Sequence, residues 1–206
     1  MSRICVITAD GGAYYAIVSR LRGAGLPFLS LLPSDADLEC GLVITTRSEA
    51  SAFSSPTLSL EDLDGNPDVA RGQILSKLSR GNKTLLVGID PGSRIGATAF
   101  LGEERLASRI FNSKSGTCSW VADLVERVPS RRSLVRIGDG DVGMASWIAR
   151  ALAVRLPDVT IEIVDEAGTS RTPSVKGLRR DQGAAAKIAF RKGLLFRFVT
   201  RSSRSR

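Results

Sequence analysis

Residues 84–192 carry a hydrophobic pattern that is compatible with few folds. Three apolar runs follow one another across short turns that contain glycine, which predicts two consecutive β-hairpins and therefore three antiparallel strands. Helical and strand patterns then alternate up to residue 192. The expected strands are 84–90, 95–100, 106–111, 133–137 and 160–164, and the expected helices are 116–127, 144–155 and 181–192. The order β-β-β-α-β-α-β-α predicts a mixed α/β sheet with helices packed against it.

Residues 1–66 predict a smaller α/β segment that ends in a Ser-rich linker. Its order is typical of half a doubly wound layer. The expected elements are strands at 3–8, 28–32 and 42–45, a helix from Gly11-Gly12 to Gly23, and one short strand at 57–60. A helix over 67–79 then opens the main domain. We expect that domain to span 67–196 and a basic tail to span 197–206.

The composition excludes several kinds of chemistry. The 206 residues include no histidine, so Ser-His-Asp triads, Cys-His dyads and His-ligated zinc or haem are ruled out. Cys5, Cys40 and Cys118 stand apart without CxxC spacing, so we expect reduced thiols in a cytoplasmic protein and no disulfide framework. No apolar run approaches the roughly 20 residues that span a bilayer, and we expect no secretory signal and no membrane partner.

The net charge of +8 is concentrated in the last fifth of the chain. From residue 167 onward there are eleven bases and one acid, whereas residues 1–166 hold 18 bases and 20 acids. Neutralised phosphates release condensed counterions, so we expect a nucleic acid as partner, with a solvated tail as the alternative. The residues expected to contact phosphates are Ser93, Arg94, Arg171, Lys176, Arg179, Arg180, Arg191 and Lys192.

Acidic residues stand at the ends of the predicted elements of the main domain. They are Asp90, Asp139 and Asp141, Asp165 and Glu166, and Asp181. Taken alone, each of these acids could have a purely structural role: Asp90 could cap a Pro-Gly turn, and Asp181 could be a helix N-cap. If the strands that end at 90, 137 and 164 are neighbours, their carboxylates converge on one edge, because strands lie about 5 Å apart.

Carboxylates gathered at one edge predict a divalent cation. They repel one another, and their pKa values rise unless a cation intervenes. Oxygen ligands without His or Cys favour Mg²⁺ or Mn²⁺. Two such ions about 3.5–4 Å apart can activate a water and stabilise the leaving oxygen of a phosphodiester. Catalysis of this kind needs no histidine, which agrees with the composition.

Three segments resemble, in the same order, the RuvC/YqgF group of RNase H-like nucleases. LLVGIDPGSRIGATAF at 85–100 resembles the opening strand and hairpin of that group. IVDEAGTSR at 163–171 is similar to a YqgF-type segment, and DQGAAAKIAFRKGLL at 181–195 is similar to the closing helix. The predicted order of elements is also that of the RNase H fold. Residues 1–82 match neither group.

The resemblance implies Mg²⁺-dependent hydrolysis of phosphodiesters. The residues it implies for catalysis and metal binding are Asp90, Glu166 and Asp181, with Asp139 as the nearest match to a fourth ligand. The chain departs from RuvC at Ala184, where a second Asp would stand, and from YqgF in its Gly-Asp-Gly turn at 138–140.

Three functions fit these residues. The first is a metal-dependent nuclease that cuts structured DNA or RNA, as a Holliday-junction resolvase does. A homodimer is one possible assembly of such a nuclease. The second is a non-catalytic RNase H-like module that binds nucleic acid. The third is an actin-like nucleotide phosphohydrolase, which ranks last because the chain shows no second GxDxG hairpin.

Overall fold

A computed structural model of the chain describes residues 3–35, 40–166 and 180–197. The chain forms two compact units. The first unit comprises Met1–Lys83 and Asp123–Arg131, and the second comprises Thr84–Ala122 and Arg132–Arg206. The helix that we expected to open the main domain therefore belongs to the first unit.

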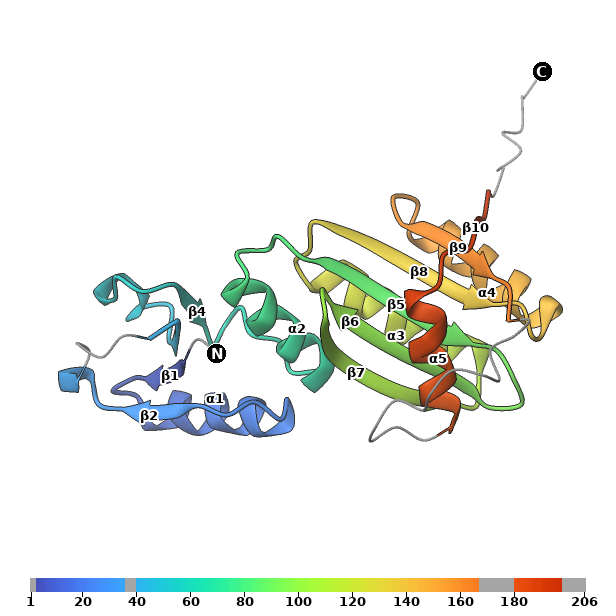
Figure 1. Cartoon of the computed structure of the whole chain (residues 1–206). Coiled ribbons are helices and arrows are strands. Elements are labelled where there is room, and N and C mark those ends of the chain that lie inside the picture. Colours follow the sequence, from blue (N-terminus) through green and yellow to red (C-terminus); the bar gives the residue numbers. More distant parts are fainter. Residues whose placement is uncertain (1–2, 36–39, 167–179, 198–206) are drawn as a thin grey trace, which may run out of the picture. The chain divides into compact units, whose positions relative to one another are not determined.

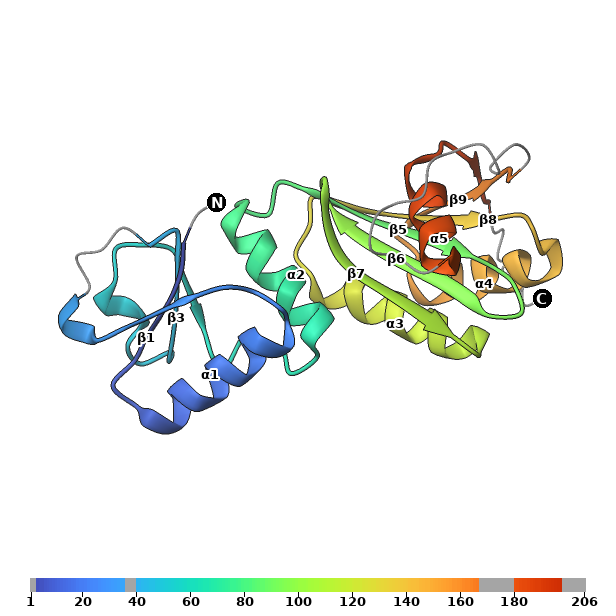
Figure 2. The ribbon, with the colours of Figure 1, turned by 60° about the horizontal axis from the view of Figure 1, so that its bottom comes forward.

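The first unit is built on a four-stranded parallel sheet, drawn in blue to cyan in Figures 1 and 2. The strand order is β2-β1-β3-β4, with β1 (Ile4–Ile7), β2 (Leu29–Leu31), β3 (Leu42–Thr45) and β4 (Thr57–Ser59). The other elements are the helices α1 (Gly11–Gly23) and α2 (Pro67–Leu78) and the short 3-10 turns η1 (Pro33–Asp35) and η2 (Ala50–Ala52). Both β1 and β3 are buried at every residue, which explains why their sequences are continuous apolar runs. The strands and the helix predicted for this segment are confirmed.

Polar side chains begin both helices of the first unit. The Asp10 side chain accepts a hydrogen bond from the backbone N–H of Ala13, and Asn66 accepts one from the N–H of Asp68. Such caps satisfy amide groups that have no partner inside the helix. They explain why α1 and α2 start where they do.

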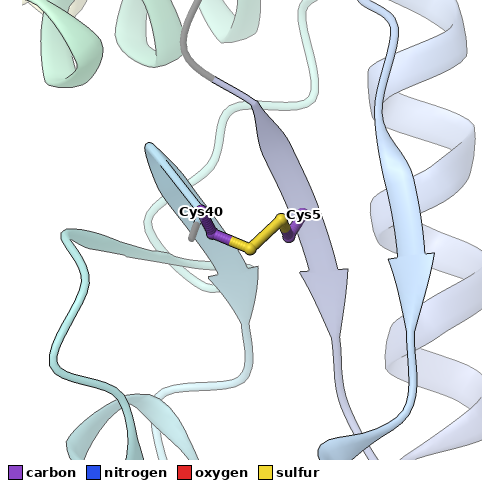
Figure 3. The surroundings of a disulfide bond; sticks show 2 residues. All are labelled: Cys5 and Cys40. Atoms are coloured by element: carbon purple, nitrogen blue, oxygen red, sulfur yellow. A yellow bond between two sulfur atoms is a disulfide. The ribbon is translucent and has the colours of Figure 1, made fainter. Parts of the chain in front are cut away.

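Cys5 and Cys40 form a disulfide, shown in Figure 3, with Cα atoms 6.0 Å apart. The two residues meet because β1 and β3 are neighbours, with Ile4 opposite Leu42. The expectation of reduced thiols is therefore wrong for this pair. The expectation of a cytoplasmic location loses the support of this pair, because disulfides persist mainly in oxidising compartments. Cys118 is free and buried, and burial raises the pKa of its thiol.

The second unit contains a six-stranded mixed sheet with the order β10-β9-β8-β5-β6-β7 (Figure 1). Its strands are β5 (Thr84–Asp90), β6 (Ile95–Leu101), β7 (Glu104–Phe111), β8 (Arg132–Gly138), β9 (Thr160–Val164) and β10 (Leu194–Leu195). The pairs β5–β6 and β6–β7 are antiparallel, whereas β8 runs parallel to both β5 and β9. Three antiparallel strands joined to two parallel ones in this order define an RNase H-like sheet, which confirms the predicted fold class. The short strand β10, antiparallel to β9, was not predicted.

Helices cover both faces of this sheet, as Figures 1 and 2 show. Helix α5 (Arg180–Phe190) lies on one face, and α4 (Val142–Arg155) and the first part of α3 (Lys114–Arg127) lie on the other. The core under α5 consists of Leu86, Phe100, Leu134, Ala186 and Ala189. A Cβ on Gly88 would stand 2.0 Å from the carbonyl oxygen of Ala185, so glycine there lets α5 lie directly on β5. No helix within the described residues is long and apolar enough to cross a membrane.

Candidate functional site

Asp90 ends β5 and has a glycine beside it on each neighbouring strand. In the β5–β6 ladder Asp90 lies opposite Gly96. On the other side Ile89 lies opposite Ile137, so Gly138 stands at the level of Asp90 on β8. Alternate residues of a strand share a face, so Asp90 lies on the face that α5 covers. Neither neighbouring strand places a Cβ beside Asp90 on that face.

The Glu166 carboxylate lies over Gly138. A Cβ on Gly138 would stand 1.8 Å from Glu166 Oε1 and 2.7 Å from its Cδ. The backbone N–H of Gly140 donates a hydrogen bond to Oε1 over 3.2 Å. Neighbouring strands are about 4.8 Å apart, so this carboxylate lies about one strand spacing from the position of Asp90. Glu166 thus reaches from the end of β9 back over β8 toward β5.

Asp139 lies next to Glu166. The N–H of Asp139 donates to the carbonyl oxygen of Val164 over 3.1 Å, which continues the pairing of β8 with β9. Its Oδ1 accepts a hydrogen bond of 2.9 Å from the N–H of Glu166. Asp141, two residues on, is instead the N-cap of α4 and accepts from the N–H of Met144 over 2.8 Å. The structure therefore brings Asp139 and Glu166 together and gives Asp141 a capping role.

The backbone of Asp181 lies in the first turn of α5, and its side chain lies outside what the structure describes. One turn later, about 6 Å along the helix, Ala185 lies directly over Gly88. The carbonyl oxygen of Gln182 accepts a hydrogen bond of 3.1 Å from Thr98 Oγ1, and Thr98 lies two residues from the partner of Asp90. The first turn of α5 is therefore on the same face of the sheet as Asp90.

The atoms that these residues offer to a cation are carboxylate oxygens, the donors that Mg²⁺ and Mn²⁺ prefer. From described residues, Glu166 accepts one long hydrogen bond and Asp139 accepts one through Oδ1, and these bonds leave lone pairs on each carboxylate for a ligand. Among the described residues there is no group of three or more acidic or cysteine side chains arranged to hold a metal ion. The donor chemistry fits a divalent cation, and completing such a group requires Asp181 or a shift of the carboxylates.

Four of the residues expected to contact phosphates lie within the described side chains. Ser93 and Arg94 are exposed in the turn between β5 and β6, and Lys192 is exposed after α5. Arg191 Nη1 donates to the carbonyl oxygen of Asp165 over 3.0 Å, at the end of β9 that leads to Glu166. The others lie outside the described side chains: Arg171, Lys176, Arg179 and Arg180.

An ion pair on the α5 face of the sheet was missed by the sequence analysis. Arg136 Nε donates to Glu162 Oε2 over 2.7 Å, and Nη1 of the same guanidinium donates to the carbonyl oxygen of Ala189 over 2.7 Å. The two side chains are only 12% and 20% exposed. Since the pair joins β8, β9 and the end of α5, it positions the helix that carries Asp181. Its signal was present as one charged residue inside each of two apolar runs.

Glu49 of the first unit was also missed, and it lies beyond the carboxyl ends of β1 and β3. Its carboxylate accepts hydrogen bonds from the hydroxyls of Thr8 (2.6 Å), Thr45 (3.0 Å) and Thr46 (2.6 Å) and from the N–H of Ala9 (2.7 Å). Burial acts to raise the pKa of Glu49, but these hydrogen bonds outweigh it and lower the pKa from 4.5 to about 2. The carboxylate is thus held ionised by its own chain, and it ties β1 to β3.

Solved structures offer a remote likeness. No family model and no curated protein matches the sequence. The structure is similar to that of RuvC from Thermus thermophilus, with a TM-score of 0.39 and 14% sequence identity, over 51% of this chain and 90% of that one. The assignment of the RNase H-like fold rests on the strand order and directions described above.

Proposed function

We propose that the second unit is a nuclease that hydrolyses phosphodiesters in structured DNA or RNA with a divalent metal. One observation carries the proposal: the Glu166 carboxylate lies over Gly138, about one strand from Asp90, while Asp139 is hydrogen-bonded to the Glu166 backbone. Three acidic residues from three separate strand ends thus lie at one edge of the sheet. Repulsion among them favours a bound cation.

Asp90, Asp139 and Glu166, with Asp181 from α5, would hold Mg²⁺ or Mn²⁺. Such a metal, when bound, activates a water and stabilises the leaving oxygen of the phosphodiester. The chain itself supplies the positioning. Gly138 leaves the space that Glu166 occupies, and the Arg136–Glu162 pair holds the end of α5 against the sheet.

Basic side chains near this edge would bind the substrate backbone. Arg94 is exposed in the turn that follows Asp90, and Arg191 and Lys192 follow α5. Contacts of this kind set the register of a nucleic acid without reading its sequence. Branched DNA, including four-way junctions, and folded RNA are therefore the substrates to test.

The test is cleavage of branched DNA and structured RNA by the full chain with Mg²⁺ or Mn²⁺. We expect nicking that EDTA abolishes and that Asp90→Asn removes. Asp141→Asn is the matched control, because that carboxylate caps α4, and cleavage by this variant should persist. Cleavage that Asp90→Asn leaves unchanged would refute the proposal. Salt-sensitive binding without any cleavage would instead support a non-catalytic nucleic-acid-binding module.

A further inference from the structure

The outer surface of α4 carries an exposed indole with a cation against it. Trp147 is 43% exposed, whereas the other tryptophan, Trp120, is only 8% exposed. Nζ of Lys114, the first residue of α3, lies 4.8 Å from the centroid of the Trp147 ring. Arg150 follows Trp147 by three positions, which places it on the same side of α4, and it is exposed as well. The surface therefore combines one large aromatic ring with two positively charged side chains.

This surface lies at the end of the second unit's sheet that holds the candidate site. Helix α4 begins three residues after Asp139, and Trp147 stands about 8 Å along that helix from its start. Helix α3 begins shortly after Phe111, the last residue of β7, which pairs with Ile95 at the start of β6. Asp90 pairs with the next residue of β6, so α3 and α4 both begin at the end of the sheet where Asp90 lies.

We propose that Lys114, Trp147 and Arg150 bind unpaired nucleotides, so that the substrate carries a single-stranded segment beside the scissile phosphate. The position of the cut rests on the proposed nuclease function, whereas binding at this surface needs no metal. A nucleobase stacks on an exposed aromatic ring, and such stacking tolerates any sequence because every base has a π-face. The positively charged side chains of Lys114 and Arg150 attract the phosphates of the nucleic-acid backbone.

Charge favours a nucleic acid over a second copy of this chain. Helix α4 contains no acidic residue between its first and last positions. Two copies of this surface brought together by a two-fold axis would place the cations of Lys114 and Arg150 near their own counterparts. Like charges at an interface without compensating acids oppose association. A polyanion meets no such barrier.

The experiment measures binding of a labelled oligothymidylate of about 12 nucleotides, and of a duplex of equal length, to the full chain in EDTA. Trp147→Ala should weaken single-strand binding about tenfold and leave duplex binding within about twofold. Trp147→Phe keeps an aromatic ring and should retain most of the affinity. Tyr15→Ala removes a 77% exposed aromatic ring from the first unit and should change neither affinity. Melting temperatures of all variants establish that they are folded.

Unchanged single-strand affinity in Trp147→Ala would overturn the inference. So would a sedimentation experiment in which Trp147→Ala converts a dimer to a monomer while oligonucleotide binding stays intact, since the surface would then be a protein interface. The assay contains no metal, so its result is independent of the cleavage assay with Asp90→Asn. Single-strand binding without metal-dependent cleavage would support nucleotide binding at this surface and refute the proposed nuclease function.

Discussion

Each of the two units places a glutamate beyond the carboxyl ends of parallel strands, but the two carboxylates have different surroundings. Glu49 of the first unit accepts hydrogen bonds from three hydroxyls and two backbone amides, and its pKa is held at about 2. Within the described part of the chain, Glu166 of the second unit accepts one long hydrogen bond, from the N–H of Gly140, and it lies one strand from Asp90, another carboxylate. A carboxylate surrounded by donors stabilises the fold, whereas one placed among other acids is available to an external cation.

The largest expected effect separates the two acidic positions by activity. Asp90→Asn should reduce metal-dependent cleavage about 10³-fold, the scale of losing several kcal/mol of metal-assisted stabilisation. Glu49→Gln should leave the cleavage rate within about twofold at a temperature where the protein stays folded, because Glu49 serves the fold of the first unit. Single-turnover nicking of a branched DNA measures both. Equal losses of cleavage rate in Asp90→Asn and Glu49→Gln would contradict the distinction between an acid that serves cleavage and an acid that serves the fold.

The second prediction compares the units by redox state. The Cys5–Cys40 bond closes a loop with a sequence separation of 35, and chain entropy assigns such a cross-link about 3–4 kcal/mol. Reduction should therefore lower the unfolding temperature of the first unit and leave that of the second unit unchanged in calorimetry. The double variant Cys5→Ala/Cys40→Ala should melt at the lower temperature and respond no further to reductant. A uniform shift of both units would contradict this prediction.

The third prediction concerns the space that Glu166 occupies. In Gly138→Ala the new Cβ would stand 1.8 Å from Glu166 Oε1, so the carboxylate must leave its place over β8. Cleavage should fall about 10²-fold, since misplacing a reacting group by about 1 Å costs that much. Gly11→Ala, with no atom within 4 Å of its new Cβ, is the control and should cleave normally. Normal cleavage by Gly138→Ala would show that the position of Glu166 is unimportant.

The smallest expected effect is on stability against acid. Because the pKa of Glu49 is about 2 in the folded chain and 4.5 is its ordinary value, its contribution is complete above pH 4.5 and is lost as the pH falls toward 2. Glu49→Gln should cost about 1–3 kcal/mol at pH 7 through the weakened hydrogen bonds. The deficit should shrink between pH 4.5 and 2. Urea titrations across this range measure it, and a deficit independent of pH would mean that the charge contributes nothing.

Much of the fold follows from local patterns in the sequence. Apolar runs and glycine-containing turns predict the three antiparallel strands correctly, because hairpins form between neighbouring segments. Helix α5 ends at Phe190, two residues before the predicted end at 192. Strand β10 was not predicted, since two residues carry too little pattern to indicate a strand and its pairing with β9 decides the outcome. The disulfide was missed for a similar reason. Its two cysteines meet only through the parallel pairing of β1 with β3.

The sequence by itself determined which acidic residues are candidates for the metal site, because strand periodicity places Asp90, Asp139 and Glu166 at or just past the ends of buried strands. Tertiary structure alone decided which of them meet. Parallel pairing of β8 with β9 brings Glu166 to Asp139, and the missing side chain of Gly138 lets that carboxylate lie over β8. The physical reason is range: local propensity acts over a few residues, whereas these contacts join positions 26 or more residues apart and depend on the order of the strands.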